Sequence, residues 1–243
     1  MENLALFIFL ALIAEILGTV GGFGSSLFFV PIAGYFLDFH SVLGITAVFH
    51  LTSNVSKIAM FRNGIDKKLL IHLGIPSVIL VIIGALLSSY FSSDKLELSL
   101  GIFLIILSVF FLIKKDFELR PTNANAIAGG SISGFLAGLI GTGGAVRGLT
   151  LTSFRLPMAV FIATSAFIDL FIDASRSVVY FFNGYIHQHD LYLIPILFVV
   201  SIVGTYIGKI ILRSVSEDRF RIIVLVLIFI TGIITIYKFF MHE

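Results

Sequence analysis

Several apolar runs of about 20 residues constrain the fold most, because each is as long as the hydrocarbon core of a bilayer is thick. They lie at residues 42–61, 69–90, 96–113, 191–212 and 222–237. The chain is 58% hydrophobic and only 12% charged, and its mean hydropathy of +1.09 leaves no room for a soluble domain. These features predict an all-α, polytopic membrane protein that crosses the plasma membrane several times and has the lipid bilayer as its solvent.

Charge and cysteine content exclude several other classes of protein. The net charge of +2 is small and scattered, so we expect no nucleic-acid partner. The chain contains no cysteine, which rules out disulfides and thiol chemistry. The N-terminal run lacks the basic flank and the cleavage site of a secretory signal, so we expect a retained membrane segment. We expect no cofactor and no enzymatic activity.

An internal repeat divides the chain into two halves. Several glycines recur 120 positions later: Gly18, Gly21 and Gly24 at 138, 141 and 144, Asn63-Gly64 at 183–184, and Gly84 at 204. A polar stripe recurs at a spacing of 119; it consists of Thr46, His50, Asn54 and Lys57 in the first copy and of Ser165, Asp169, Asp173 and Arg176 in the second. Agreement over the whole length predicts two homologous repeats, residues 1–120 and 121–243, within a single integrated membrane domain.

The distribution of basic residues predicts that the two repeats are inverted. Segments 62–68, 114–120 and 213–221 each carry three Lys or Arg residues, whereas segments 37–41 and 183–190 carry none and 92–97 carries one. Because cytoplasmic loops are enriched in Lys and Arg, we expect the first three segments inside and the others outside. Each half is then a broken, re-entrant-like hairpin followed by three transmembrane helices. This odd number of crossings turns the second half upside down.

Each hairpin is broken by a glycine-rich stretch, "GTVGGFGSS" at 18–26 and "GLIGTGGA" at 138–145. The first hairpin has arms of about 14 residues (4–17) and about 11 residues (27–37), against the roughly 20 that a crossing needs. Glycine permits the tight turn, and the second arm then begins inside the membrane with unpaired N–H groups and a partial positive charge. Paired breaks in inverted halves therefore predict a binding site for an anion. The alternative is that the glycines only allow helices to pack closely.

The expected site lies where the two breaks meet. The substrate-binding residues that we expect are Gly21, Gly22, Gly24, Ser25, Ser26, Asn54, Gly141, Thr142, Gly143, Gly144 and Arg147. Arg147 directly follows the second break, where its guanidinium can hold a carboxylate or sulfonate through two parallel hydrogen bonds. The alternative for Arg147 is an internal ion pair with Asp169 or Asp173.

Charged residues within membrane segments cost a few kcal/mol each, so they usually pair or face a cavity. Each polar stripe follows one face of a helix, and we expect the two faces to look toward each other. Carboxylates and histidine relay protons in membranes, which makes Glu15, His50, Asp169 and Asp173 the candidates for proton coupling. Lys57 and Arg176 lie toward opposite ends of their helices and are candidate gate residues. The alternatives are a buried network that joins the halves, a Lys57 that snorkels to the interface, and a Glu15 that only hydrogen-bonds between helices.

Two further motifs carry no assignment. "HQHD" at 187–190 contains metal-ligating residue types, but it lies on an expected exposed loop without further partners, so we assign no metal site there. "GGSISG" at 129–134 lacks both the spacing and the partner histidine of a serine hydrolase.

The two glycine motifs resemble those of the sulfite exporter TauE/SafE family of membrane permeases. The resemblance rests on "GTVGGFGSSLFFVPI" and "GFLAGLIGTGGAVRG", on "GITAVFH" and "IATSAF", and on the basic loop "FRNGIDKKLL" before a helix with Pro76 and Gly84. Phe23 in the first glycine run and Leu151–Thr152, where a proline is usual, depart from the family pattern. The resemblance implies a secondary carrier of small anions, chiefly sulfite, organosulfonates and other small organic acids.

We therefore expect a secondary transporter of a small anion, coupled to protons and working by alternating access. The first alternative is a cation or metal permease that uses Glu15, Asp169 and Asp173 as ligands. The second is a membrane scaffold that binds no small solute. The sequence leaves a homodimer possible.

Overall fold

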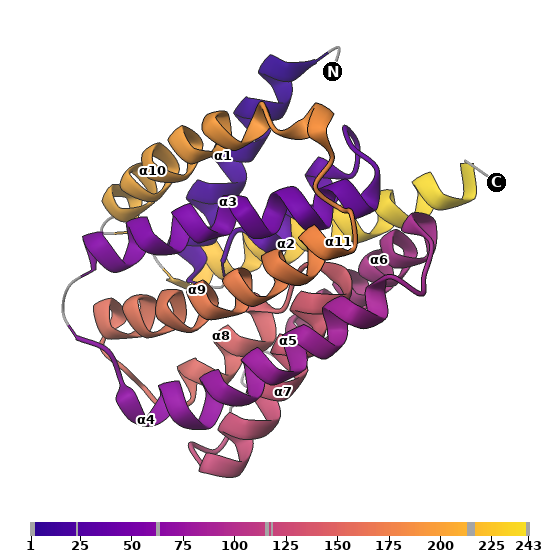
Figure 1. Ribbon diagram of the computed structural model, residues 1–243. Helices are drawn as coiled ribbons and strands as arrows, with labels where there is room; N and C mark the ends of the chain where they lie inside the picture. The colour runs from indigo at the N-terminus through magenta and orange to yellow at the C-terminus, as the bar shows by residue number, and fades with distance from the viewer. Residues whose placement is uncertain are drawn as a thin grey trace.

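The computed structural model describes residues 3–22, 24–61, 64–114, 117, 119–212 and 217–241, and within these ranges all regular structure is helical (Figure 1). The first half contains α1 (Leu4–Gly21), α2 (Ser26–Ala33), α3 (Phe39–Met60), α4 (Lys67–Leu69), the π-helical turn η1 (Leu70–Gly74), α5 (Ile75–Ser88) and α6 (Ser93–Ile113). The second contains α7 (Asn123–Ile140), α8 (Gly144–Thr152), α9 (Met158–Phe182), the 3₁₀ turn η2 (Gln188–Asp190), α10 (Leu193–Ile211) and α11 (Glu217–Met241).

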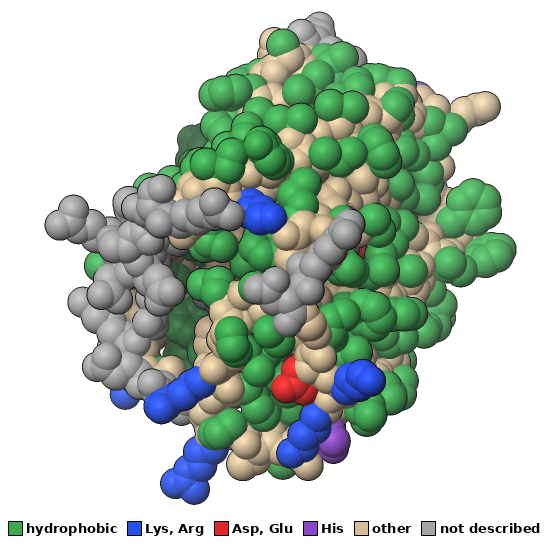
Figure 2. All heavy atoms as spheres, turned by 90° about the vertical axis from the view of Figure 1, so that its left-hand side faces the viewer, with side chains coloured by type: hydrophobic (Ala, Val, Ile, Leu, Met, Phe, Trp, Pro, Cys, Tyr) green, Lys and Arg blue, Asp and Glu red, His purple; other side chains and the backbone are tan. Residues whose placement is uncertain are grey.

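Seven of the described helices are long and apolar enough to cross a membrane. The five apolar runs of the sequence become α3, the continuous segment α4–η1–α5, α6, α10 and α11. Figure 2 shows one face of the molecule, which is mostly hydrophobic, with most of its Lys and Arg side chains on its lower part. The prediction of an all-α, polytopic membrane protein is therefore confirmed. Arg62 and Arg213 of the basic loops lie outside the described residues.

Both predicted breaks are present. The residue directly after α1, Gly22, adopts a left-handed conformation with φ of 69°, and the residue directly after α7, Gly141, does so with φ of 81°. Only glycine adopts this conformation without a steric cost, which explains why the chain turns at these two positions. After each turn a short helix follows, of 8 residues in α2 and 9 residues in α8.

The first arm is longer than the sequence indicated, which corrects one prediction. We expected about 14 residues, but α1 has 18, a length of about 27 Å at 1.5 Å per residue. The physical reason is that a glycine with helical dihedrals does not end a helix. Gly18 and Gly21 continue α1, and only the left-handed Gly22 stops it. The short arms are therefore α2 and α8 alone.

Helices of the first half pack against helices of the second half. In Figure 1, α10 of the second half lies beside α1 of the first, and α5 of the first half lies beside α7 of the second. Gly84 and Gly204, which lie 120 positions apart, each allow close contact with the partner helix. A Cβ on Gly84 would collide with the Phe135 carbonyl of α7, and a Cβ on Gly204 would lie 2.8 Å from the Glu15 side chain of α1.

The central helices α3 and α9 pack side by side and run antiparallel. Near the start of α3, Gly44 lies against the backbone of Tyr185, just beyond the end of α9. Beyond the end of α3, the Asp66 amide donates to Thr164 Oγ1 at 3.0 Å, near the start of α9. Residue numbers thus rise along one helix as they fall along the other. The polar stripes of the two helices are in this way brought face to face.

The outer helices α6 and α11 repeat this arrangement. Gly101 lies against Ile236, and Ile105 lies against Gly232. Lys238 Nζ completes the antiparallel contact with an ion pair to Glu97 Oε1 at 2.8 Å. In both pairs, a helix packs antiparallel against the helix at the same place in the other half.

Candidate functional site

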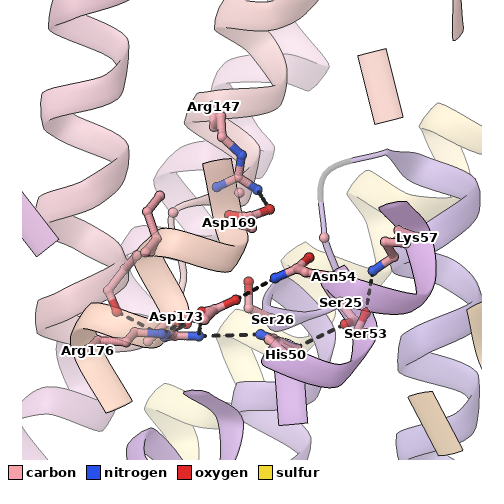
Figure 3. Close-up of a pocket in the computed structure, with 16 residues that line it drawn as sticks. Ser25, Ser26, His50, Ser53, Asn54, Lys57, Arg147, Asp169, Asp173 and Arg176 are labelled. Atoms are coloured by element: carbon pink, nitrogen blue, oxygen red, sulfur yellow. Dashed lines mark hydrogen bonds and ion pairs between the residues drawn. The ribbon is translucent and has the colours of Figure 1, made fainter. Parts of the chain in front are cut away.

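A polar cavity lies where the two breaks meet, between α3 and α9 (Figure 3). The first break contributes Gly24, Ser25 and Ser26, and the second contributes Gly141, Gly143, Gly144 and Arg147. The helix α3 adds His50, Ser53, Asn54 and Lys57, while α9 adds Asp169, Ile172, Asp173 and Arg176. The structure thus brings together most of the residues that the sequence singled out.

The two breaks touch each other directly. Ser26 Oγ, at the start of α2, lies 3.2 Å from Thr142 Oγ1 in the second break. Because the first N–H groups of a helix have no partner within it, the starts of α2 and α8 both present amides and a partial positive charge. Gly22 lines a smaller neighbouring pocket rather than the main cavity, and Gly21 is the last residue of α1.

Ser25 joins the first break to the polar stripe of α3. Its hydroxyl lies 3.0 Å from His50 Nε2 and donates to Glu15 Oε2 at 2.5 Å. His50 Nδ1 on the other side of the ring lies 3.4 Å from Arg176 Nη2. The imidazole therefore stands between a cation of the second half and a hydroxyl of the first.

Arg147 lies in the first turn of α8 and is 2% exposed. Its Nε donates to Ser165 Oγ at 3.1 Å, and its Nη2 forms an ion pair with Asp169. The guanidinium also reaches the first break, because Nη2 lies 3.7 Å from the position of a Cβ on Gly24. The internal ion pair, which was the alternative interpretation of Arg147, is thus what the structure contains.

Arg176 is built into the second break. It pairs with Asp173 at 2.6 Å and donates to the carbonyl oxygens of Ala137 at 3.1 Å and Gly141 at 2.8 Å. Tyr180 donates to the neighbouring Gly138 carbonyl at 2.6 Å. These carbonyls are at the C-terminal end of α7, where the helix dipole favours a cation. Arg176, expected as a gate residue, lies in the wall of the cavity and caps this helix.

Lys57 and Glu15 form a buried pair beside the first break. Lys57 Nζ lies 2.9 Å from Glu15 Oε1, and the two side chains are 7% and 0% exposed. Ser53 donates to Glu15 Oε1 at 2.5 Å and accepts from Lys57 Nζ at 2.6 Å. Thr205 of α10 donates to the same carboxylate at 3.0 Å. In this structure Lys57 therefore does not snorkel to the surface, and Glu15 joins α1 to both α3 and α10.

The charges around the cavity balance. Three cations, Lys57, Arg147 and Arg176, face three carboxylates, Glu15, Asp169 and Asp173. An unpaired buried charge is strongly unfavourable, whereas each of these ions has a partner. Asn54 adds a hydrogen bond to Asp173 Oδ2 at 2.7 Å. The site is consequently neutral as it stands, and any added ion has to be compensated.

Three residues of the site were missed or left without a role by the sequence. Ser53 lies four residues before Lys57, so its place on the polar stripe was a usable signal. Ser165 was recognised on its stripe but received no role. Tyr180 is fully buried and follows Arg176 by four residues, which puts both side chains on the same face of α9.

A polytopic helical protein with two broken hairpins around a buried, charge-lined cavity belongs to the class of membrane transporters. The family model described as sulfite exporter TauE/SafE matches residues 7–235, nearly the whole chain. The chain belongs to the sulfite exporter TauE/SafE family, whose members are membrane transporters of sulfite and other anions rather than enzymes. This membership and the seven apolar helices fit a multi-pass protein of the plasma membrane. No curated protein and no solved structure matches the chain.

Proposed function

We propose that the protein is a proton-coupled secondary carrier of a small anion, with sulfite, organosulfonates and related small organic acids as the substrate class. The substrate binds in the cavity between the two breaks. The observation that carries the proposal is the buried Arg147, which points at the first break from the start of α8 and is held there by Asp169. Family membership supports an anion as the cargo.

Arg147 and the helix starts form the anion-binding groups of this proposal. The amides of Ser26 and Gly144, at the starts of α2 and α8, supply partial positive charge. Ser25, Ser26, Asn54 and Thr142 add hydrogen bonds. A sulfonate or carboxylate matches the planar fork of the guanidinium better than a halide does, because it can accept two parallel hydrogen bonds.

Asp169 couples the transport of the anion to that of a proton. In the structure its carboxylate takes the place on Arg147 that a substrate anion would take. When the substrate displaces it, the neutral cavity gains one negative charge. Uptake of a proton by Asp169 restores neutrality, so anion and proton move together. His50, Asp173 and Glu15 complete the polar chain along which that proton travels.

The halves 1–120 and 121–243 act in this proposal as inverted repeats that rock against each other. The antiparallel pairs α3–α9 and α6–α11 and the exchanged pairs α1–α10 and α5–α7 support a two-fold relation between the halves. Because the site lies at the contact between halves, rocking exposes it to one side at a time. Lys57 and Arg176 then gate the two sides.

Reconstitution of an arginine variant tests the anion site. Arg147→Gln keeps a polar side chain, although a shorter one, and removes its charge. We expect transport of sulfite and small sulfonates into proteoliposomes to fall at least about 100-fold, since a bidentate charged contact to a buried anion contributes on the order of 3 kcal/mol. Arg120→Gln, an exposed arginine before α7, is the matched control and should transport normally. Wild-type rates for Arg147→Gln would overturn the proposal.

The alternative of a cation or metal permease is less favoured by the geometry. Glu15, Asp169 and Asp173 would be its ligands, but each of them is already paired with Lys57, Arg147 or Arg176. The same proteoliposomes decide between the two candidates. Uptake of a divalent cation without any anion flux would establish the permease instead.

A further inference from the structure

A second cluster of chemically competent side chains lies on the connection between α9 and α10, apart from the central cavity. His187, His189 and Asp190 each offer one ligand atom, and these atoms lie within 4.8 Å of one another. Asp190 Oδ2 lies 3.5 Å from His189 Nε2 and 3.8 Å from His187 Nδ1. Two imidazole nitrogens and a carboxylate oxygen are a ligand set suited to a divalent transition metal such as Zn²⁺.

Asp190 gives this cluster its strongest sign of a missing partner. The residue is 2% exposed, yet its Oδ2 accepts no hydrogen bond among the described residues. A buried carboxylate oxygen without a donor is costly. That same oxygen is the one that faces both imidazoles, so a cation bound between the three groups would satisfy it.

The distances are close to those that a metal requires. Around a tetrahedral zinc with ligands at about 2.0–2.1 Å, the ligand atoms are roughly 3.4 Å apart. The separations of 3.5 and 3.8 Å need only small side-chain adjustments. An ion can also reach the site from outside, because the side chains of His187 and His189 are 39% and 76% exposed.

A further carboxylate, from the other half of the chain, lies beside His187. Asp38, between α2 and α3, has its Oδ2 3.8 Å from His187 Nδ1. Its other oxygen, Oδ1, accepts from the His40 amide at 3.0 Å and caps α3, so Oδ2 stays available. Ser41 Oγ now contacts His187 Nδ1 at 2.5 Å, and a metal at this nitrogen would replace that hydrogen bond. The structure thus brings a carboxylate of the first half to the loop at 187–190, so that a small movement of its side chain would let it join the three ligands.

We propose that Zn²⁺ binds between His187, His189, Asp190 and Asp38 and clamps the two halves together on this face of the protein. The ligands come from the α9–α10 connection of the second half and the α2–α3 connection of the first. A metal that binds best where the two connections meet selects the conformation in which they meet. Bound zinc therefore holds this face shut. The effect of zinc on this face rests on the proposed transport function, whereas the binding of zinc does not.

Zinc binding to the purified, tag-free full-length protein tests the site independently of transport. Titration calorimetry with ZnCl₂ should give one ion per chain for the wild type and no binding of Mg²⁺. His189→Ala, His187→Ala and Asp38→Asn should each weaken zinc binding at least about 10-fold. His72→Ala is the control, since His72 is a partly exposed histidine on η1 whose Nδ1 contacts the Lys68 carbonyl. Failure of the wild type to bind zinc, or unchanged binding by His189→Ala, overturns the site.

Transport in proteoliposomes tests the clamp. Micromolar zinc should inhibit wild-type anion uptake, and chelation should restore it. His189→Ala, whose side chain is mostly solvent-exposed and outside the cavity, should transport at the wild-type rate and resist zinc. If zinc binds with the expected stoichiometry but leaves uptake unchanged, the clamp is wrong while the metal site stands. If no anion is transported at all, the proposed function fails and the calorimetric result still decides the site.

Discussion

At the scale of single residues, ion pairs such as that of Arg147 with Asp169 explain how this membrane protein can keep several charges in its interior. Each charge is neutralised by a neighbour, so none of these buried ions is left uncompensated. Among the three carboxylates, Asp169 has the fewest competing contacts: Glu15 is held by Lys57 and by several hydroxyls, and Asp173 by Arg176 and Asn54. Asp169 is therefore the carboxylate that a substrate displaces most easily.

Replacing Asp169 by asparagine separates binding from coupling. Asp169→Asn removes the internal competitor for Arg147, so we expect the affinity for the anion to rise by about tenfold, roughly 1.4 kcal/mol. The amide cannot take up a proton, so a pH gradient should no longer drive accumulation, while exchange of anion for anion continues. Calorimetry and proteoliposome flux with and without a pH gradient measure the two effects. Asp94→Asn, at an exposed position in α6, should change neither, and gradient-driven accumulation by Asp169→Asn would show that the proton travels elsewhere.

At the scale of helices, Gly22 and Gly141, both in the left-handed conformation, determine where the two breaks fall. Gly141 combines a φ of 81° with close neighbours from the first half: a Cβ there would lie 2.8 Å from Leu43 and 3.2 Å from Val30. Gly184 has a similar φ of 77° but nothing within 4 Å. An alanine would meet similar left-handed backbone strain at both positions but close neighbours only at Gly141, which makes the two a matched pair.

Alanine substitutions at the matched pair isolate the role of the break. Both Gly141→Ala and Gly184→Ala should lose about 1–2 kcal/mol of stability from the left-handed backbone. Gly141→Ala should lose about 1–3 kcal/mol more, because the added methyl forces α2 and α3 away from the second break. Thermal unfolding in detergent compares the two losses, and flux measurements should show impaired transport for Gly141→Ala alone. Equal destabilisation by the two changes would contradict close packing at the break.

The sequence predicted helices better than it predicted their ends and partners. Apolar length identified the spans, and duplicated glycines identified both breaks, since these are properties of local composition. Local composition does not reveal which glycine takes a left-handed conformation, so α1 is longer than expected. It also does not choose ion partners: Arg176 lay on the correct helix face, but its contact with the end of α7 depends on how α7 and α9 pack. The same reason hid the pairing of Asp38 with the loop at 187–190.

At the scale of the whole molecule, the contacts between halves are of two kinds. The pairs α1–α10 and α5–α7 are joined through glycine-lined surfaces that bring backbones close together. The contact of Asp38 and Ser41 with His187 on the α9–α10 connection is instead made by polar side chains. A closely packed surface resists sliding, whereas a few part-buried polar contacts are more easily exchanged for water. We therefore expect the second contact to open when the halves rock.

Cross-linking this contact should stop transport. The chain has no cysteine, so Ser41→Cys with His187→Cys introduces the only two thiols, at positions whose side chains lie 2.5 Å apart. Joining them with a short bifunctional thiol reagent that reductant can cleave should reduce anion uptake in proteoliposomes to background, and reductant should restore it. Each single-cysteine variant treated with the same reagent should keep transporting, which excludes simple modification as the cause. Undiminished uptake by the fully cross-linked protein would mean that the two connections stay together throughout the cycle, and the moving contact would then have to be sought along α6 and α11.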